Sequence, residues 1–413
     1  MSEASPVVPY QPQDVMFLWW LADPLAPRRV GEIGLADGNR KVWLRYDAAW
    51  LADGFALSED VPLQGGMFLP RDKDTVAGAV DDARPDRWGE RVIRLLDRPA
   101  RLSLLEYLYF AGDERFGALG VSLVKDAYRP CPSSPTPGFA SLTEMNEVVR
   151  HVLANEAVPE RQKRLLRPGV TLGGARPKSL MEMDGATWVV KFSEGESLDT
   201  PLIEHAAMRL AGLCGIQVAE TRALPVASGH AVAVRRFDRT PEGRLHAITA
   251  NVALKAAGEE LGYPELAQLL RRIGNPAHLA AQQQELFRRM VFNILIDNTD
   301  DHEKNHALLR TAGGHCQLSP AYDVVPSAQG LGYQQMRVGQ AGAESSLDNA
   351  LSEARLFGLA APRAKEIVKE ICAIVSGWRA HFSGCGVRAV DLGELAQYLD
   401  GDRLRRQREA FGR

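Results

Sequence analysis

Alternating apolar and polar positions predict short strands in the first quarter of the chain. Residues 30–34 and 41–45 have this pattern, and residues 87–96 place their apolar side chains at the 3.6-residue spacing of a helix. Residues 128–138 interrupt the pattern with a density of proline and serine that is typical of a linker. We therefore expect a separate N-terminal unit, residues 1–130, ahead of this linker.

Beyond the linker, a strand, a helix and a second strand follow one another. Residues 187–192 are rich in β-branched and aromatic side chains, residues 203–213 have helical periodicity, and residues 230–234 form a second apolar run. Strand, helix, strand is the skeleton of the small lobe of a protein kinase. We assign this lobe, with its nucleotide-binding region, to residues 139–240.

Helical periodicity dominates the last third of the chain. Apolar residues within 286–295 recur at i, i+4 spacing and predict a buried helix, which ends at the polar cluster 297–299. Residues 362–378 predict another packed helix. The last fourteen residues are charged, and we expect them to fray. A largely helical C-terminal lobe, residues 241–413, follows from these patterns.

Composition narrows the possible classes of protein. The chain has 413 residues, 45% of them hydrophobic, which is ample for a buried core. A formal net charge of -3 provides no basic field for direct DNA binding. Its five cysteines include no Cys-x-x-Cys pair, which indicates a reduced, cytoplasmic compartment. The apolar stretch 16–21 is too short to cross a bilayer, so we expect neither secretion nor a membrane anchor.

Candidate catalytic side chains gather in residues 299–306, with the sequence TDDHEKNH. Asp300 and Asn305 stand five residues apart, and Asp323 of the pair Tyr322-Asp323 follows 23 residues after Asp300 (323 − 300). A kinase needs one carboxylate for the substrate hydroxyl, an amide oxygen for magnesium and a second carboxylate between the metal and the phosphates. These residue types in this order predict phosphoryl transfer.

A zinc hydrolase is one alternative for the same segment. His302 and His306 match the zinc-protease pattern H-E-x-x-H. That pattern needs both histidines on one helix face, whereas this segment follows a polar cluster that ends a helix. The longer form of the pattern also fails, because Leu309 and Ala312 stand at its Gly and His positions.

The other alternative is that the acidic residues are structural. Asp297, Asp300 and Asp301 would then cap helices and turns, as aspartate commonly does. Each aspartate, taken singly, favours this structural interpretation. Together with a lysine elsewhere in the chain, they favour phosphoryl transfer.

Lys191 ends an apolar strand, where an ammonium group is costly unless it meets an anion. The α- and β-phosphates of ATP would serve, and Glu204 in the next helix could supply the ion-pair partner that kinases use. The alternatives are an edge-strand lysine that reaches solvent and a solvated acid in the first helical turn.

Upstream, residues 171–179 have the small residues and basic flanks of a phosphate-binding loop, although they match neither Walker A nor G-x-G-x-x-G. An ordinary Gly-Gly turn explains them equally well.

With these motifs the chain resembles the HipA family, the kinase toxins of bacterial type II toxin-antitoxin modules. The likeness is carried by the T-D-x-H-x-K-N loop at 299–305, the Tyr-Asp magnesium motif at 322–323, the lysine-bearing strand at 189–191, the Gly-Ala loop at 173–178 and the Arg-Phe-Asp-Arg hinge at 236–239. A patchier likeness extends to the N-terminal unit, at 30–32, 85–86 and 116–119.

The resemblance implies an α+β, two-lobed fold of the protein-kinase and phosphoinositide-kinase type, with a small N-terminal α/β subdomain and a largely helical C-terminal lobe. It implies a protein Ser/Thr kinase that uses ATP and Mg²⁺, with Asp300 and His302 in the catalytic loop and Asn305 and Asp323 as metal ligands. For His302 we expect a role in steadying the loop, with an ordinary loop histidine as the alternative. The residues expected at ATP are Gly173, Gly174, Ala175, Arg176, Lys178, Lys191, Glu204, Arg236, Phe237 and Tyr322.

The resemblance also implies partners and regulation. Expected partners are a HipB-like helix-turn-helix antitoxin, DNA only through that antitoxin, and a protein substrate of the translation machinery such as an aminoacyl-tRNA synthetase. Thr171 stands where family members autophosphorylate a hydroxyl residue, although the best-known pattern has serine there, and a plain turn residue is the alternative.

Two further departures concern the substrate side. Arg235 precedes the hinge where an acidic residue is common, and residues 246–249 replace an acidic pair. These changes put the substrate-side contacts in question. A second class of protein is a catalytically silent regulator that acts through protein contacts, and the intact set of Lys191, Asp300, Asn305 and Asp323 argues against it.

Overall fold

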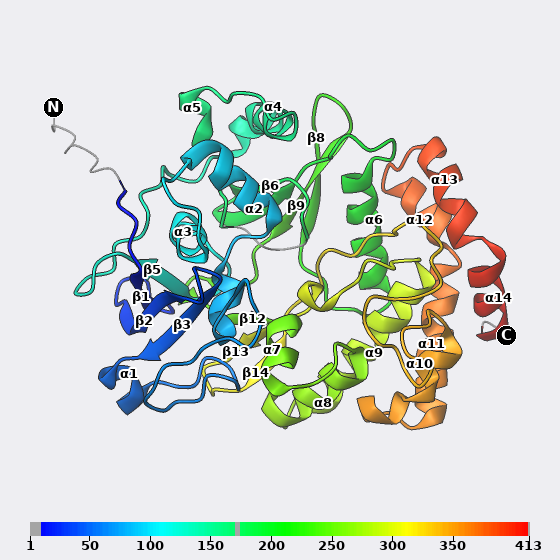
Figure 1. Cartoon of the computed structure of the whole chain (residues 1–413). Helices are drawn as coiled ribbons and strands as arrows, with labels where there is room; N and C mark the ends of the chain where they lie inside the picture. Colours follow the sequence, from blue (N-terminus) through cyan, green and yellow to red (C-terminus); the bar gives the residue numbers. More distant parts are fainter. Residues whose placement is uncertain (1–9, 170–173, 412–413) are drawn as a thin grey trace.

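The structure, a computed structural model, describes residues 10–169 and 174–411 (Figure 1). It has the expected α+β architecture: two antiparallel-rich sheets in the first two thirds of the chain, followed by a mainly helical lobe. Among the described residues no helix is long and apolar enough to cross a membrane.

The N-terminal unit is built on a five-stranded sheet in the order β4-β3-β2-β1-β5. Its strands are β1 (Val15–Trp20), β2 (Arg28–Ala36), β3 (Lys41–Tyr46), β4 (Thr75–Val76) and β5 (Leu119–Ser122). The helices of this unit are α1 (Ala48–Asp53), α2 (Arg87–Val92) and α3 (Leu104–Phe110). The strands expected at 30–34 and 41–45 and the helix expected from residue 87 are thereby confirmed.

The small lobe is an antiparallel sheet in the order β6-β7-β9-β8. Its strands are β6 (Lys178–Met183), β7 (Ala186–Lys191), β8 (Thr221–Pro225) and β9 (His230–Arg235), and its helices are α4 (Leu142–Leu153), α5 (Glu160–Lys163) and α6 (Thr200–Leu213). The predicted strand, helix and strand of this lobe are confirmed.

Successive residues of β7 face opposite sides of this sheet, as in any strand. Trp188 and Val190 pack with Met145 of α4 and with Trp88, which comes from the N-terminal unit. Val189 packs on the other side, with Ile203 of α6. Lys191, two residues after Val189, therefore lies on the α6 side.

The C-terminal lobe is mainly helical. Its helices are α7 (Ala250–Ala257), α8 (Tyr263–Ile273), α9 (Leu279–Leu295), α10 (Leu347–Ser352), α11 (Ala361–Val375), α12 (Trp378–Gly384), α13 (Ala389–Leu399) and α14 (Asp402–Phe411). It also contains a hairpin of β10 (Arg239–Thr240) and β11 (Gly243–Arg244), and a three-stranded sheet of β12 (Ala247–Thr249), β13 (Ala307–Arg310) and β14 (Cys316–Leu318).

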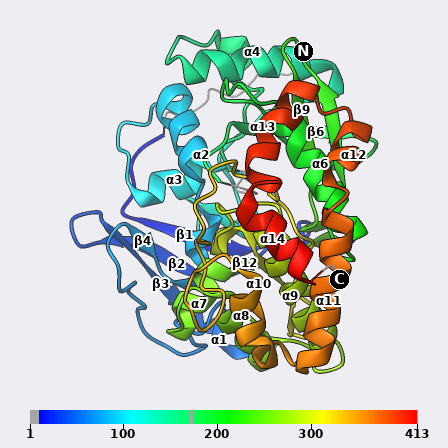
Figure 2. The ribbon, with the colours of Figure 1, turned by 90° about the vertical axis from the view of Figure 1, so that its right-hand side faces the viewer.

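Two expectations for the C-terminal region need correction. Residues 402–411 do not fray but form α14, which packs against α11 and buries Leu404 and Arg408 (Figure 2). The helix expected at 362–378 is confirmed as α11, but it ends earlier, at Val375, and Trp378 already starts α12. Charge alone indicated fraying, but a helix with one buried face tolerates a charged exposed face.

Candidate functional site

Lys191 is at the centre of the site. Its ammonium group lies 2.7 Å from Glu204 Oε1 and 2.5 Å from Asp323 Oδ1, and its side chain is almost fully buried. β7 lies between β6 and β9, so the alternative of an edge-strand lysine is wrong. Glu204 is also buried, which excludes a solvated first-turn acid. The strand thus points its last side chain at two carboxylates from distant segments.

The charges of this cluster stabilise one another. Burial by itself lowers the pKa of Lys191, but the carboxylates of Asp323 and Glu204 raise it above the ordinary value. Burial likewise favours the neutral form of Asp323, yet Lys191 outweighs it and lowers the pKa of Asp323 to about 2. At neutral pH the site therefore holds a charged lysine beside an ionised aspartate.

The loop before β6 approaches the same aspartate. A Cβ atom placed on Gly174 would lie 3.9 Å from Asp323 Oδ2, the oxygen that Lys191 does not bind. Arg176 lies 3.5 Å from Glu196 and lowers the pKa of Asp323 further. Ala175 is exposed between them, whereas Gly173 and Thr171 lie outside the described residues.

Asp300 lies in the loop that follows α9, as expected, and its side chain is exposed. Its backbone N–H donates to Ser327 Oγ at 3.1 Å. Desolvation raises the pKa of Asp300, and the negative charge of Asp323 raises it further, while His302 and Arg176 lower it. Asp300 and Asp323, 23 residues apart in sequence, therefore act on each other electrostatically within one site.

Asn305 has a side-chain oxygen that no described residue binds. The residue is buried, and its Oδ1 atom has no hydrogen-bond partner among the described residues. An unpaired buried oxygen is costly unless a ligand binds it. Amide and carboxylate oxygens are the donors that Mg²⁺ prefers, so Asn305 Oδ1 together with the carboxylate of Asp323 fits this metal.

The zinc-hydrolase alternative fails on geometry. Residues 303–305 form a single 3₁₀ turn, so His302 and His306 do not share the face of an α-helix. His306 is buried, and its Nε2 atom lies 2.8 Å from Asp301 Oδ2. His302 Nδ1 is buried without a partner in the described part of the chain.

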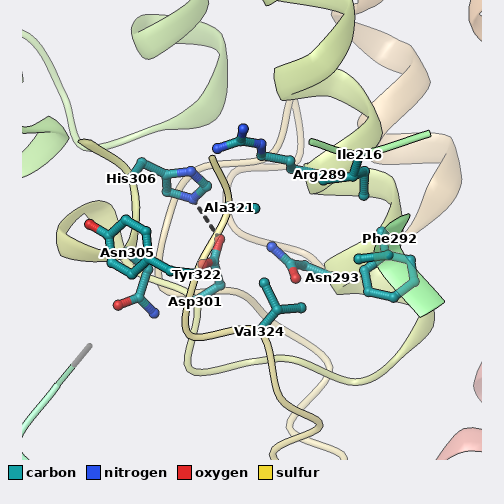
Figure 3. A pocket seen from close by; sticks show the side chains of 11 residues that line it. Ile216, Arg289, Phe292, Asn293, Asp301, Asn305, His306, Ala321, Tyr322 and Val324 are labelled. Carbon is teal, nitrogen blue, oxygen red and sulfur yellow. Dashed lines mark hydrogen bonds and ion pairs between the residues drawn. The ribbon is translucent and has the colours of Figure 1, made fainter. Parts of the chain in front are cut away.

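A polar network supports the loop from behind. Asp301 Oδ2 accepts hydrogen bonds from Tyr263 and His306, and Asn293 donates to the Tyr263 hydroxyl at 3.3 Å. Figure 3 shows Asp301, His306 and Asn293 around a small cavity, with the other ring nitrogen of His306 turned toward Arg289. Asp301 is thus a buried structural carboxylate, as the capping interpretation allowed, whereas its neighbour Asp300 is exposed.

Two residues expected at ATP are engaged elsewhere. Lys178 is completely buried, and its ammonium group donates to Asp86 of the N-terminal unit and to the Gly174 carbonyl. Arg236 is buried too, and it donates to Asp238 and to the Arg115 carbonyl, 2.9 Å away. Both side chains form ion pairs with carboxylates inside the protein. The expected roles of Lys178 and Arg236 at ATP stay predictions.

The hinge nevertheless lies beside the site. Asp238 accepts a hydrogen bond from the Gly117 N–H at 2.8 Å, and Gly117 has a φ of 79° with Ala247 close by, which excludes a larger side chain. The half-buried ring of Phe237 lies 5.4 Å from that of Tyr322, whose hydroxyl donates to the Lys304 carbonyl. The segments that contain Phe237, Tyr322 and Lys304 therefore meet.

Two stretches of the chain match domains of known proteins. Residues 24–122 match the model of the HipA N-terminal domain, and residues 170–378 match that of the HipA-like C-terminal domain. The second match alone spans just over half of the chain. This chain belongs to the HipA family.

Individual relatives agree with this assignment. Over 35% of its own length, this chain is 31% identical to the Sinorhizobium fredii putative kinase Y4dM. Over 38% of its own length, it is 26% identical to the serine/threonine-protein kinase toxin HipA of Shewanella oneidensis. These matches span 38% and 43% of the two relatives. The fold matches a chain of the S. oneidensis complex of HipA, HipB and operator DNA with a TM-score of 0.65 at 17% identity, covering 96% of this chain and 97% of that one.

In this HipA-family chain, residues 246–249 stand where the family has an acidic pair. These residues contact the N-terminal unit. Thr249 caps α7, and its N–H and hydroxyl both donate to Asp82, the hydroxyl at 2.8 Å. His246 is buried against aromatic rings, and desolvation lowers its pKa to about 4. Sequence patterns could not predict that Asp82 binds Thr249 or that Asp86 binds Lys178, because these partners lie far apart along the chain.

Proposed function

We propose that this HipA-family chain is a magnesium-dependent protein Ser/Thr kinase. The observation that carries the proposal is the buried cluster of Lys191, Glu204 and Asp323, next to the unpaired Asn305 oxygen and the exposed Asp300. Phosphoryl transfer requires a cation for the phosphates, oxygen ligands for magnesium and a carboxylate at the acceptor hydroxyl. This cluster offers each of them.

Each side chain has a proposed task. Lys191, held by Glu204, orients the α- and β-phosphates, and Asn305 and Asp323 hold magnesium. Asp300 positions the acceptor hydroxyl and takes up its proton. When bound, Mg·ATP supplies the γ-phosphoryl group that is transferred. Positioning and electrostatic stabilisation then account for most of the rate.

The surrounding residues would shape the nucleotide site. Gly174, Ala175 and Arg176 lie at the end of the loop that approaches Asp323, where they can cover the phosphates. Phe237 and Tyr322 present neighbouring rings at the hinge, where an adenine base can lie against them. We assign Lys178 to holding the Gly174 carbonyl and His302 to steadying the catalytic loop.

We further propose that the chain acts as a toxin with a HipB-like helix-turn-helix antitoxin and reaches DNA only through that partner. The similar structure from S. oneidensis is a complex of HipA with HipB and operator DNA. For the substrate we propose a protein of the translation machinery, such as an aminoacyl-tRNA synthetase. Thr171 is a proposed site of autophosphorylation, which mass spectrometry after incubation with ATP would detect.

Labelled ATP, magnesium and cell lysate provide the deciding experiment. The wild-type chain should label a small number of lysate proteins, and Asp300→Ala should not. If the wild-type chain binds ATP but transfers no phosphate to any protein, the kinase proposal fails and the catalytically silent regulator takes its place.

A further inference from the structure

Asp297, two residues after the end of α9, has a backbone conformation that is rare for residues other than glycine. Its φ is 55°, in the left-handed region, and its carboxylate is completely buried. Oδ1 lies 2.7 Å from Arg403 Nη2, and Oδ2 accepts the Gly330 N–H at 2.9 Å. A buried carboxylate persists only when it is paired and hydrogen-bonded, and Arg403 of α14 is its one cationic partner among the described residues.

The backbone of Asp297 continues this contact toward the catalytic loop. Its carbonyl accepts the Ser327 N–H at 2.9 Å. Ser327 Oγ in turn accepts the N–H of Thr299 at 2.9 Å and of Asp300 at 3.1 Å. The peptide group that carries Asp300 is thus fixed to Ser327, and Ser327 is fixed to Asp297.

Helix α14 also contacts the far end of the segment 327–345, which begins at Ser327. Arg403 Nη1 donates to the Ser345 carbonyl at 3.1 Å, and Gln407, one turn later, accepts the Leu347 N–H at 2.7 Å. Leu404 of this helix is buried, and the helix packs against α11 (Figure 2). Through Arg403 the last helix therefore joins both ends of the segment 327–345, which follows the magnesium motif.

We propose that Arg403 is a positioning residue for phosphoryl transfer, because it connects α14 through Asp297 and Ser327 to the backbone of Asp300. This inference rests on the proposed kinase activity, in which Asp300 is the catalytic carboxylate. It adds that the C-terminal helix is required for the geometry of the catalytic loop, although it contributes no side chain to the site.

Hydrogen exchange tests the connection without any activity. In Arg403→Ala, the peptides that cover residues 297–303 should exchange faster than in the wild-type chain, because the N–H groups of Thr299 and Asp300 lose a fixed acceptor. Arg405→Ala is the matched control, since Arg405 lies on the same helix and, among the described residues, forms ion pairs only with exposed Asp402 and Glu409. Unchanged exchange in Arg403→Ala would overturn the proposal even if the chain proves not to be a kinase.

A double variant distinguishes misplacement of the catalytic loop from general unfolding. Asp297→Asn combined with Arg403→Met removes both charges, so no carboxylate is left buried without a partner, and asparagine tolerates a positive φ. Its kcat should fall roughly 10- to 100-fold through misplacement of Asp300, while KM for ATP changes less, since Lys191 and Glu204 are untouched. A folded double variant with wild-type kcat would disprove the positioning role.

Discussion

Lys191 Nζ lies 2.7 Å from Glu204 Oε1, and both side chains are almost fully removed from solvent. This ion pair joins the last residue of β7 to the first turns of α6. Asp323 adds a second carboxylate to the same ammonium group. The pair therefore links the small lobe to the magnesium motif of the C-terminal lobe.

Removing this lysine should affect both activity and stability. In Lys191→Met, phosphate transfer should be lost, and the free energy of unfolding should fall by about 3 kcal/mol, because two buried carboxylates lose their counter-ion. Denaturant titration and a kinase assay measure the two effects. Glu204→Gln keeps an acceptor for the lysine and should lose less activity than Lys191→Met. Equal activity in Lys191→Met and the wild type would refute the assignment.

Asp300→Ala should separate catalysis from folding. The side chain is exposed, so the melting temperature should change little, whereas kcat should fall roughly 100- to 1000-fold with the loss of the carboxylate at the acceptor hydroxyl. Asp348→Ala, an exposed aspartate on α10, is the control for the loss of one negative charge. An Asp300→Ala variant as active as the wild type would exclude Asp300 as the catalytic carboxylate.

Asn305 should determine the magnesium requirement. Asn305→Ala removes the unpaired buried oxygen, so half-maximal phosphate transfer should need at least roughly tenfold more Mg²⁺. Asn305→Asp keeps an oxygen donor and should need less Mg²⁺ than the alanine variant. Titration of the initial rate with MgCl₂ at saturating ATP measures this. Identical magnesium curves for Asn305→Ala and the wild type would remove Asn305 from the metal site.

Asp238 should make the stability of the hinge region depend on pH. Burial alone would raise its pKa, but Arg236 and Arg239 hold the pKa of Asp238 far below its ordinary value of 3.8. A depressed folded-state pKa means that the stabilisation is fully present above pH 3.8 and is lost as the pH falls below it. The difference in unfolding free energy between the wild type and Asp238→Asn should therefore shrink under acid, as denaturant titrations at pH 7 and pH 3 would measure. A constant difference would contradict this.

Local patterns predicted the elements around the site because helices and strands depend on the spacing of apolar residues. The strand that ends at Lys191 and the helix that carries Glu204 both follow from periodicity. The spacing of Asp300, Asn305 and Asp323 indicated phosphoryl transfer, since the chemistry needs those side-chain types in that order.

The sequence indicated Glu204 as a partner of Lys191 but could not assign partners to the other buried charges. Lys178 has the same local context as a phosphate-binding lysine, yet Asp86, 92 residues away, binds it. In the same way, the charged C-terminal tail predicted fraying, whereas Arg403 pairs with Asp297 across 106 residues. A charge is stable inside a protein only beside an opposite one, and which opposite charge lies within reach depends on how distant elements pack.

By itself, then, the sequence determined the elements, the kinase-type motif and the likeness to the HipA family. Only the tertiary structure decided which carboxylate pairs with each buried cation. Lys191 stays at the site because strand alternation points it toward α6, while Arg236 turns inward to Asp238. Periodicity is a local property of the chain, but the pairing of buried charges is a property of the packed molecule.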